Sequence, residues 1–410
     1  MRLHSFYNVG HGDAVLIRDA TSLVVRDIGQ PSRIKKCRKQ FYQNCLSLAL
    51  NVICYSDLKR YAVVSHAHED HFSGFMKLYY RNQFQIFEEC YIPPLVTSPS
   101  SAFRVYVGDF DGSLRERLKQ KVDLYLKIFA SLKKNSATKK TISNWFFLLP
   151  VMNFLSKKVY QVSFSDKILN GDATVLWPYL AKSAKDGNKY DDVICEKMDD
   201  LESALKLELE NPFIGITQEE EFNRYVDEIV SIYLKILDSK EQGQDEKGLY
   251  VERISTILKN VSNNIKVSVS YSVKVLFCRA INNDDDNQGV AFQYDDASAI
   301  YLCDFYGVYI DKMLTIMNKY TLLKSQYELL KSSHHGSRYG QNLQNVTYNG
   351  VIHCCGIGTK AHKGPDVGYL NKHRRSFCMD WDFYSSKWDA RVYKASLPLV
   401  YPCVKKSFKI

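Results

Sequence analysis

Three of the chain's 10 histidines lie within the six residues His66–His71, in the order His-x-His-x-Asp-His. Imidazole nitrogens and carboxylate oxygens are ligands for first-row divalent metal ions. On an extended segment, side chains two residues apart point the same way, so His66 and His68 could hold one ion together. A turn after them would let Asp70 and His71 face a second ion beside the first. The spacing predicts a site for two metal ions rather than a solvated loop.

Four ligands cannot complete two metal sites, and two later segments supply further candidates. SAIYLCDFYG places Asp304 just after an apolar run, where a single acid more often caps a turn or a helix. ELLKSSHHGSRYG places His334 and His335 before a glycine that allows a tight turn. Adjacent side chains point to different sides of an extended chain, so one histidine could bind metal while the other faces substrate. The alternative is that both are surface histidines.

The histidine cluster follows directly on YAVVS, a β-branched run over Tyr61–Ser65. This run predicts a buried strand, and the loop at the carboxyl end of a strand is where α/β folds commonly carry their chemistry. Further strands are predicted for HSFYNVG, GDAVLIRD, SLVVRDIG, KVYQVSF, ATVLWPYL, VSVSYSVKVLFC and SAIYLCDFYG.

Helical patterns fill most of the remaining sequence. They cover residues 37–55, 111–134, 138–158 with a break near Pro150, and about 190–261. IDKMLTIMNKYTLLKSQYELLKSS predicts a helix followed by a short strand. We therefore expect one catalytic α/β core that is interrupted by helical insertions at about 101–158 and 185–262.

Composition indicates a globular chain with a preference for anionic partners. Hydrophobic residues make up 45% of the 410 residues and charged residues 24%, and the formal net charge is +10. A positive balance favours nucleic acid or nucleotides as partners. The predicted helix 111–134 carries seven basic residues, although a solvated helix face is the alternative; they are Arg115, Arg117, Lys119, Lys121, Lys127, Lys133 and Lys134. The acidic block 191–246 would repel nucleic acid, so we expect it to face elsewhere or to bind a partner protein.

No segment has the pattern of a membrane or export signal. The amino terminus MRLHSFYNVGHGD has no long apolar core and no small-residue cleavage site. The most apolar run, Trp145–Leu155, is too short to span a membrane and contains Pro150. The 11 cysteines form no CxxC pair and are predicted to be reduced thiols. We expect a cytoplasmic protein without membrane contact.

These motifs resemble the metallo-β-lactamase fold superfamily, most closely the domain of this fold in competence proteins for DNA internalisation. The phosphorylcholine esterases also resemble this competence-protein type of domain. SHAHEDH matches the superfamily signature, and Asn8–Asp13 resembles the family's Asp-Val-Gly-Gln-Gly-Asp. Further resemblances follow in the family's order up to about residue 366; they are Arg26–Gly29 to Asp-x-Gly, TVLWPYL to Leu-x-Pro, Asn263, Asn264 and Ser268 to Asn-Asn-x-Ser, YLCDF to Leu-Thr-Gly-Asp, and LKSSHHGS to Leu-Lys-Val-x-His-His-Gly-Ser.

Three positions depart from the family's pattern. Asn8 replaces the opening acid, and Cys303 replaces the small glycine before Asp304, which predicts a less open loop. The family's late Gly-His-Pro segment corresponds only loosely to Ala361–Pro365. Among the histidines without a motif, we predict that His4 and His373 are structural and that His353 lies in the core.

The resemblance implies a fold and a set of metal ligands. The fold is a four-layer αββα sandwich that forms a single catalytic domain over residues 1–410, with the metals at one edge between the sheets. One ion would be held by His66 and His68, and a second by Asp70, His71 and His335, with Asp304 as the bridging ligand. Zinc suits the histidine-rich set, and manganese is the alternative because carboxylates also take part.

The implied chemistry is Lewis-acid hydrolysis. Two ions would lower the pKa of a shared water and take up charge on the attacked phosphoryl or carbonyl oxygen. Asp70 would orient the nucleophile, and protonated His334 would donate to the leaving oxygen. Ser337 and His362 are predicted to contact the substrate.

Three functional hypotheses follow. The first is a phosphodiesterase or nuclease that acts on nucleic acid or nucleotides. The second is a hydrolase of a small ester, thioester, lactone or phosphorylcholine ester. The third is a metal-stabilised module whose helical insertions bind a partner protein.

Overall fold

The computed structural model describes residues 2–7, 9, 12–29, 48, 52–54, 57–96, 112–178, 213–238, 243–287, 289–305, 307–336, 346–353, 376–378 and 405–409. Of these, residues 214, 283–287, 307, 308, 335, 336, 350–353, 376–378 and 405–409 are described by their backbone alone. The chain forms two compact units. The two-sheet unit comprises Met1–Pro93, Leu155–Tyr179 and Asp286–Ile410, and the helical unit comprises Pro94–Phe154 and Leu180–Asp285.

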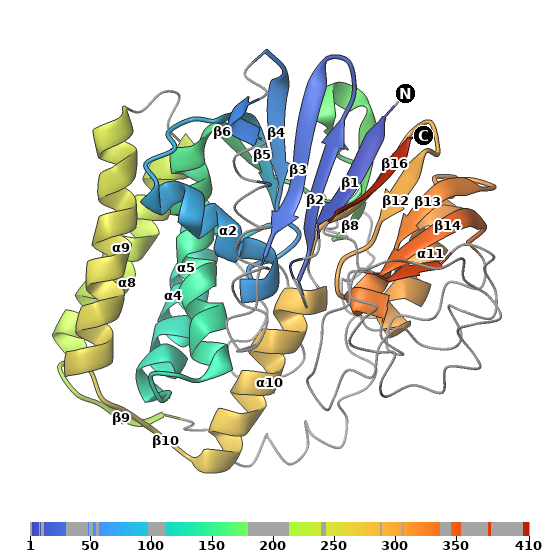
Figure 1. The fold of residues 1–410 in the computed structure, drawn as a ribbon. Helices are drawn as coiled ribbons and strands as arrows, with labels where there is room; N and C mark the ends of the chain where they lie inside the picture. Colours follow the sequence, from blue (N-terminus) through green and yellow to red (C-terminus); the bar gives the residue numbers. More distant parts are fainter. Residues whose placement is uncertain are drawn as a thin grey trace, which may run out of the picture. The chain divides into compact units, whose positions relative to one another are not determined.

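The described strands of the two-sheet unit form two seven-stranded sheets (Figure 1). The first sheet has the order β16-β1-β2-β3-β4-β5-β6, with β1 at Leu3–Tyr7, β2 at Ala14–Arg18, β3 at Ser22–Ile28, β4 at Lys59–Val63, β5 at Phe87–Ile92, β6 at Ser156–Gln161 and β16 at Lys405–Lys409. The second has the order β15-β14-β13-β12-β11-β8-β7, with β7 at Lys167–Ile168, β8 at Ala173–Trp177, β11 at Ala291–Tyr294, β12 at Ala299–Tyr301, β13 at Tyr327–Lys331, β14 at Tyr348–His353 and β15 at Ser376–Cys378. The helical segments of this unit are α2 at Glu69–Tyr80, η1 at Leu169–Gly171, α11 at Gly307–Lys319 and η3 at Ser333–Gly336.

Each sheet combines an antiparallel part with a parallel part. The strands from β16 to β3 are antiparallel neighbours, whereas β3, β4, β5 and β6 run parallel. In the second sheet β7, β8, β11 and β12 are antiparallel, whereas β12, β13, β14 and β15 run parallel. The carboxyl ends of the parallel strands β3 and β4 therefore lie side by side along one edge of the first sheet, the edge at which these strands end. The carboxyl ends of β12 and β13 lie in the same way along one edge of the second sheet.

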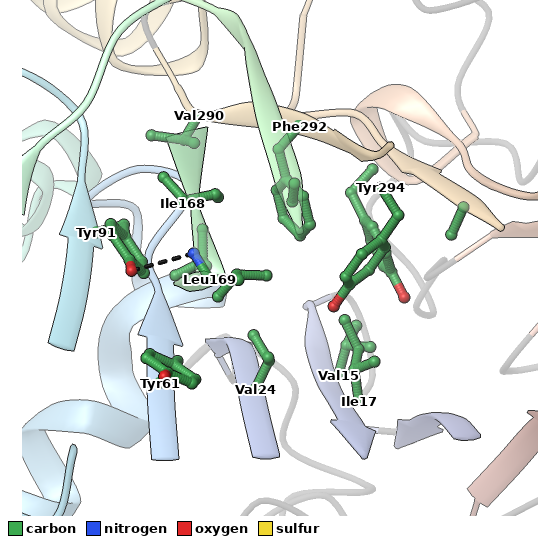
Figure 2. Packing of buried hydrophobic residues seen from close by; sticks show 14 of the residues in the cluster. Val15, Ile17, Val24, Tyr61, Tyr91, Ile168, Leu169, Val290, Phe292 and Tyr294 are labelled. Carbon is green, nitrogen blue, oxygen red and sulfur yellow. Dashed lines mark hydrogen bonds between the residues drawn. The ribbon is translucent and has the colours of Figure 1, made fainter. Parts of the chain in front are cut away.

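The two sheets share one hydrophobic core. Figure 2 shows Val15, Val24 and Tyr61 of the first sheet beside Phe292 and Tyr294 of the second, and all five belong to a single buried cluster. Burial of each such side chain contributes roughly 1.5–3 kcal/mol to folding. This packing fixes the edges of the two sheets against each other.

The first sheet is also covered on its other face. In β2 the residues Ala14, Leu16 and their alternating neighbours are all buried, which requires a packed layer on both sides of the strand. Helix α2 packs against β3, and a Cβ at Gly74 of α2 would lie only 2.2 Å from the side chain of Ile28. The absence of a side chain at position 74 thus lets the helix that carries His71 lie close to the sheet.

The helical unit contains α4 at Leu114–Ser131, α5 at Ala137–Leu155, α8 at Glu219–Asp238, α9 at Gln244–Asn264 and α10 at Tyr271–Asn287, with the antiparallel pair β9 at Phe213–Ile216 and β10 at Val267–Val269. Helix α4 begins with a capping box in which the Ser113 side chain and Glu116 bond to each other's backbone N–H groups. Among the described helices, none combines the length and the apolar character that crossing a membrane requires.

Several predicted elements are confirmed. KVYQVSF overlaps β6, ATVLWPYL contains β8, the basic segment forms α4, and IDKMLTIMNKYTLLKSQYELLKSS gives α11 followed by β13. The structure is mixed α/β, as predicted. Of the helix predicted over residues 37–55 only Leu48 and 52–54 are described, and residues 190–212 lie outside the description.

Two local predictions are wrong. The segment after Val269 is helix α10 rather than strand, because Val273, Phe277 and Ile281 bury one helical face. Pro150 lies inside α5 without ending it. In contrast, a strand does follow Asn263 and Asn264, as their resemblance to the family's strand entry implies. Strand β10 contains Ser268 and pairs with β9.

The buried residue His4 predicts a pH dependence of folding. Its Nδ1 atom lies 2.5 Å from the Tyr301 hydroxyl, and burial lowers the pKa of His4 to about 3. Because the pKa in the unfolded chain is near 6.5, His4 costs no stability above pH 6.5. As pH falls from 6.5 to about 3, the unfolded chain takes up a proton that the folded chain does not, and stability falls by about 1.4 kcal/mol per pH unit.

Urea denaturation across this pH range measures the effect. His4→Phe should show a weaker pH dependence than the wild type, whereas Tyr301→Phe, which removes only the hydrogen-bond partner, should retain it. Equal pH dependence in the wild type and His4→Phe would contradict this account.

Candidate metal centre

His66, His71 and Asp304 come together in the fold. One ligand atom from each lies within 4.8 Å of the others. The rings of His66 and His71 have their centroids 4.0 Å apart, and Nε2 of His71 lies 3.3 Å from Oδ2 of Asp304. The two histidines are fully buried and Asp304 is 3% exposed. Two imidazoles and a carboxylate are a donor set that suits a divalent cation such as zinc.

Strand direction explains how residues so distant in sequence meet. His66 follows β4 and Asp304 follows β12, and each strand belongs to the parallel part of its sheet. His71 lies in the first turn of α2, the helix that begins directly after His68. The carboxyl edges of two facing sheets therefore supply the ligands from opposite sides.

Ser65 and Asp27 hold the two imidazoles from behind. The Asp27 carboxylate accepts hydrogen bonds from the backbone N–H of Ser65 (2.7 Å) and from its hydroxyl (2.8 Å). The Ser65 hydroxyl oxygen lies 3.0 Å from Nδ1 of His66, and Nδ1 of His71 lies 3.1 Å from the Asp27 carboxylate. Both Nδ1 atoms lie beside acceptor oxygens, so each imidazole would keep a proton at Nδ1 and offer Nε2 to a metal ion.

Asp27 adopts a strained backbone conformation. Its φ angle is 53°, in the left-handed region that residues other than glycine rarely occupy. Such a conformation costs roughly 1–3 kcal/mol and persists where the surrounding contacts fix it, often at functional sites. The hydrogen bonds to Ser65 are contacts of this kind.

Two glycines let the chain pass close behind the histidine loop. A Cβ at Gly12 would lie 2.8 Å from the carbonyl oxygen of Asp70, and a Cβ at Gly29 would lie 1.6 Å from the same atom. The N–H of Asp13 donates to that carbonyl over 2.9 Å. The Gly-x-Gly-Asp and Asp-x-Gly motifs therefore support the backbone of Asp70 and His71.

A buried arginine lies beneath this loop. Arg26 is fully buried, and its guanidinium donates to Asp13 over 2.8 Å and to the carbonyl of Leu302 over 3.0 Å. It also lies 3.1 Å from the Asp27 carboxylate. A charge in such surroundings is stable only when paired and hydrogen-bonded, which these contacts provide.

Lys331 is a second buried cation at the same place. Its ammonium forms an ion pair with Asp13 and lies 3.7 Å from Oδ1 of Asp304. Asp13, Asp27 and His71 also offer ligand atoms close together. Because two cations, of Arg26 and Lys331, already pair with these acids, we interpret that group as an ionic network and not as a further metal site.

The electrostatic field favours positive charge between the ligands. Burial alone lowers the pKa of His71, but the nearby carboxylates, led by Asp304 and Asp13, outweigh it and raise this pKa to about 10. In contrast, burial and the neighbouring rings of His71 and His68 hold the pKa of His66 well below its usual value. Metal binding would replace the proton on His71, because a ligating imidazole must be neutral.

His68 and Asp70 lie nearby but are more exposed. The rings of His68 and His66 have their centroids 4.7 Å apart. The negative charge of Asp70 partly opposes the lowering of the His66 pKa. Among the side chains that the structure describes, neither belongs to a group of three or more closely spaced ligand atoms.

His334 lies beside Asp304 in the short helix η3. Its Nδ1 atom is 3.2 Å from the carbonyl oxygen of Asp304, so Nδ1 carries the proton and Nε2 is the other reactive nitrogen. The residue is 9% exposed and has a φ of 43°, which again indicates a conformation fixed by its surroundings. The side chain of His335 and all of Ser337 and His362 lie outside the described residues.

Cys303 occupies the position where the family resemblance has a glycine. Its thiol is buried, 3.4 Å from Nδ1 of His66. A Cβ at Gly289 would lie 2.0 Å from the Cys303 sulfur, so the absence of a side chain at position 289 makes room for the thiol.

Sequence reasoning did not assign a role to Asp13, Arg26, Asp27, Ser65 or Lys331. All five are fully buried polar or charged residues. The fragments Arg26–Gly29 and LKSSHHGS contain three of them, but a single sequence does not reveal that Arg26 and Lys331 are buried. Long cationic side chains are rarely buried unless paired, and these pairs form only in the folded chain.

No protein-family model matches this chain, and no curated protein sequence matches it.

Gly29→Ala tests the support of the histidine loop. The added methyl group would overlap the carbonyl of Asp70 and lie 2.1 Å from the backbone nitrogen of His71. We expect the free energy of unfolding to fall by about 1–3 kcal/mol or more, because the backbone must shift. Urea denaturation measures this, and Gly215→Ala, which adds a methyl group with no atom within 4 Å, is the control. Equal stability of both variants would contradict the close approach at Gly29.

Ser65→Ala tests the hydrogen bonds behind the imidazoles. Loss of the hydroxyl frees the ring orientation of His66, and we expect zinc affinity to fall about 10- to 100-fold. Competition with a chelator of known affinity measures the change. Ser131→Ala removes a hydroxyl that donates to the carbonyl of Ile128 in α4 and should leave zinc affinity unchanged. An unchanged affinity in Ser65→Ala would show that the hydroxyl does not orient the ligands.

Proposed function

We propose that the chain is a metal-dependent hydrolase of the metallo-β-lactamase fold, with two divalent cations at the candidate centre. The observation that carries this proposal is the burial of His66, His71 and Asp304 together at the carboxyl edges of two facing sheets. Two packed sheets, with α2 on one outer face and α11 in contact with β8, support a four-layer αββα arrangement.

The proposed ligand set extends beyond these three residues. His66 and His68 would hold one cation, and Asp70, His71 and His335 the other, with Asp304 shared between them. The close rings of His66 and His68 support the first pair. The position of Asp304 beside Nε2 of His71 supports its part in the second. Zinc is the preferred metal for this set and manganese the alternative.

When bound, the cations would supply Lewis-acid activation of a water molecule and of the substrate's phosphoryl or carbonyl oxygen. The protein's own side chains would orient the reactants. Asp70, which is partly exposed at the start of α2, would position the attacking water. Nδ1 of His334 donates a hydrogen bond to the backbone carbonyl of Asp304, which leaves Nε2 to face the substrate. In the protonated form of His334, Nε2–H would donate to the leaving oxygen.

A phosphodiester of nucleic acid or a nucleotide is the proposed substrate. The net charge of +10 supports an anionic substrate. Part of the basic helix does not contribute to this argument. Lys121 is buried and donates to the carbonyl of Leu95, while Lys119 and Lys127 form ion pairs with Asp227 and Asp123.

Hydrolysis of a small ester is the second candidate function. The observation that favours it is this pairing of the α4 lysines within the helical unit, which reduces the free positive charge available to a nucleic acid. The two candidates share the metal centre and differ only in substrate.

Metal analysis followed by a nuclease assay tests the proposal. We expect about two equivalents of zinc per chain after loading, and nicking of plasmid or single-stranded DNA that a chelator abolishes. Asp304→Asn should lose at least one equivalent and reduce cleavage by 100-fold or more, roughly the contribution of one charged group that stabilises a transition state. Asp311→Asn, an exposed aspartate in α11, is the matched control and should behave as wild type.

The outcomes separate the hypotheses. Cleavage of small esters with no action on nucleic acid would support the second candidate. A biological activity that survives Asp304→Asn would contradict both hydrolase functions and favour a partner-binding module.

A further inference from the structure

Lys331, the last residue of β13, contacts further groups besides the carboxylate that balances its charge. It is fully buried and forms an ion pair with Asp13. Its ammonium also lies 3.7 Å from Oδ1 of Asp304 and donates to the carbonyl of Leu302 over 3.3 Å. The last two contacts reach the loop that carries the proposed bridging ligand.

The backbone of that loop is fixed by the segment 331–334. Each carbonyl oxygen of residues 302–305 lies within hydrogen-bond distance of a donor from this segment, namely Lys331 Nζ to Leu302 (3.3 Å), Ser333 Oγ to Cys303 (2.7 Å) and to Phe305 (2.9 Å), and His334 Nδ1 to Asp304 (3.2 Å). The carbonyl groups therefore face donors of the segment 331–334, with the single hydroxyl proton of Ser333 shared between those of Cys303 and Phe305. The side chain of Asp304 is the part of the loop that offers a ligand atom beside His66 and His71.

The two oxygens of Asp304 have different neighbours. Oδ1 lies toward the ammonium of Lys331, whereas Oδ2 lies 3.3 Å from Nε2 of His71. A cation held between His66 and His71 would therefore meet Oδ2. An ammonium behind a carboxylate fixes its rotation and decides which oxygen is presented, as outer partners of metal ligands commonly do.

We propose that Lys331 is a positioning residue that presents Oδ2 of Asp304 to the metal and fixes the loop at Leu302. This inference rests on the proposed function, because it requires a cation at the candidate centre. The role is separate from the pairing of Lys331 with Asp13. If both members of that pair are removed together, the charges stay balanced, but the orientation of Asp304 should still be lost.

The test uses the full chain with Lys331→Met and Asp13→Asn combined. This double variant removes one buried charge of each sign and leaves Arg26 paired with Asp27, so no buried charge loses all its partners. Asp13→Asn alone is the control that keeps the lysine. We expect the double variant to bind zinc about 10- to 100-fold more weakly than Asp13→Asn, measured by chelator competition. We also expect the visible absorption spectrum of bound Co²⁺ to shift, because the coordinating oxygen of Asp304 is displaced.

Lys331→Arg provides a second test that keeps the charge. The guanidinium is planar and longer, so it cannot reproduce the contacts to both Leu302 and Asp304. We expect a shifted Co²⁺ spectrum and weaker zinc binding in this variant. If the double variant does not fold, Lys331→Arg alone tests the inference.

Each result has a defined consequence. If the double variant folds and has the zinc affinity and Co²⁺ spectrum of Asp13→Asn, Lys331 only balances charge and the inference is overturned, while the proposed function stands. The same holds if Lys331→Arg matches the wild type in both measurements. If the wild-type chain binds neither metal, the proposed function fails and the inference fails with it.

Discussion

The buried carboxylate of Asp27 is the contact on which the candidate centre depends. It accepts hydrogen bonds from the backbone and hydroxyl of Ser65, lies 3.1 Å from Nδ1 of His71, and pairs with Arg26. One side chain thus joins β3 to the loop after β4 and to the first turn of α2. In a low-dielectric interior these charge-assisted bonds are strong, and an unpaired carboxylate there would be costly. The orientation of His66 and His71 follows from this constraint.

The sequence predicts those elements whose local pattern agrees with their tertiary surroundings. The predicted strands that became β6 and β8 and the predicted basic helix that became α4 are examples. The segment VSVSYSVKVLFC contains both an alternating pattern and a helical one, and burial of Val273 and Phe277 decides for the helix. Pro150 costs roughly 3 kcal/mol within a helix, but the buried residues on both sides of it in α5 offset this.

The candidate ligands are easier to predict from the sequence than the residues that support them. His66 and His71 belong to a dense histidine motif, and Asp304 follows an apolar strand, so their chemistry is visible in the sequence. Arg26 and Lys331 look like ordinary surface cations until the fold buries them beside Asp13. Their pairing joins β3 to β13, which belong to different sheets, and no local pattern encodes such a contact.

The central claim is that His66, His71 and Asp304 form a cation site built from both sheets. Burying two imidazoles and a carboxylate together is costly unless they are paired, and a divalent cation between them would pair with all three. A crystal structure of zinc-loaded protein, with anomalous data collected on both sides of the zinc absorption edge, tests the claim most directly. The account predicts anomalous peaks within about 2.0–2.2 Å of the His66 and His71 nitrogens and an Asp304 oxygen. Zinc bound only elsewhere, with these three side chains bonded to one another in loaded crystals, would contradict it.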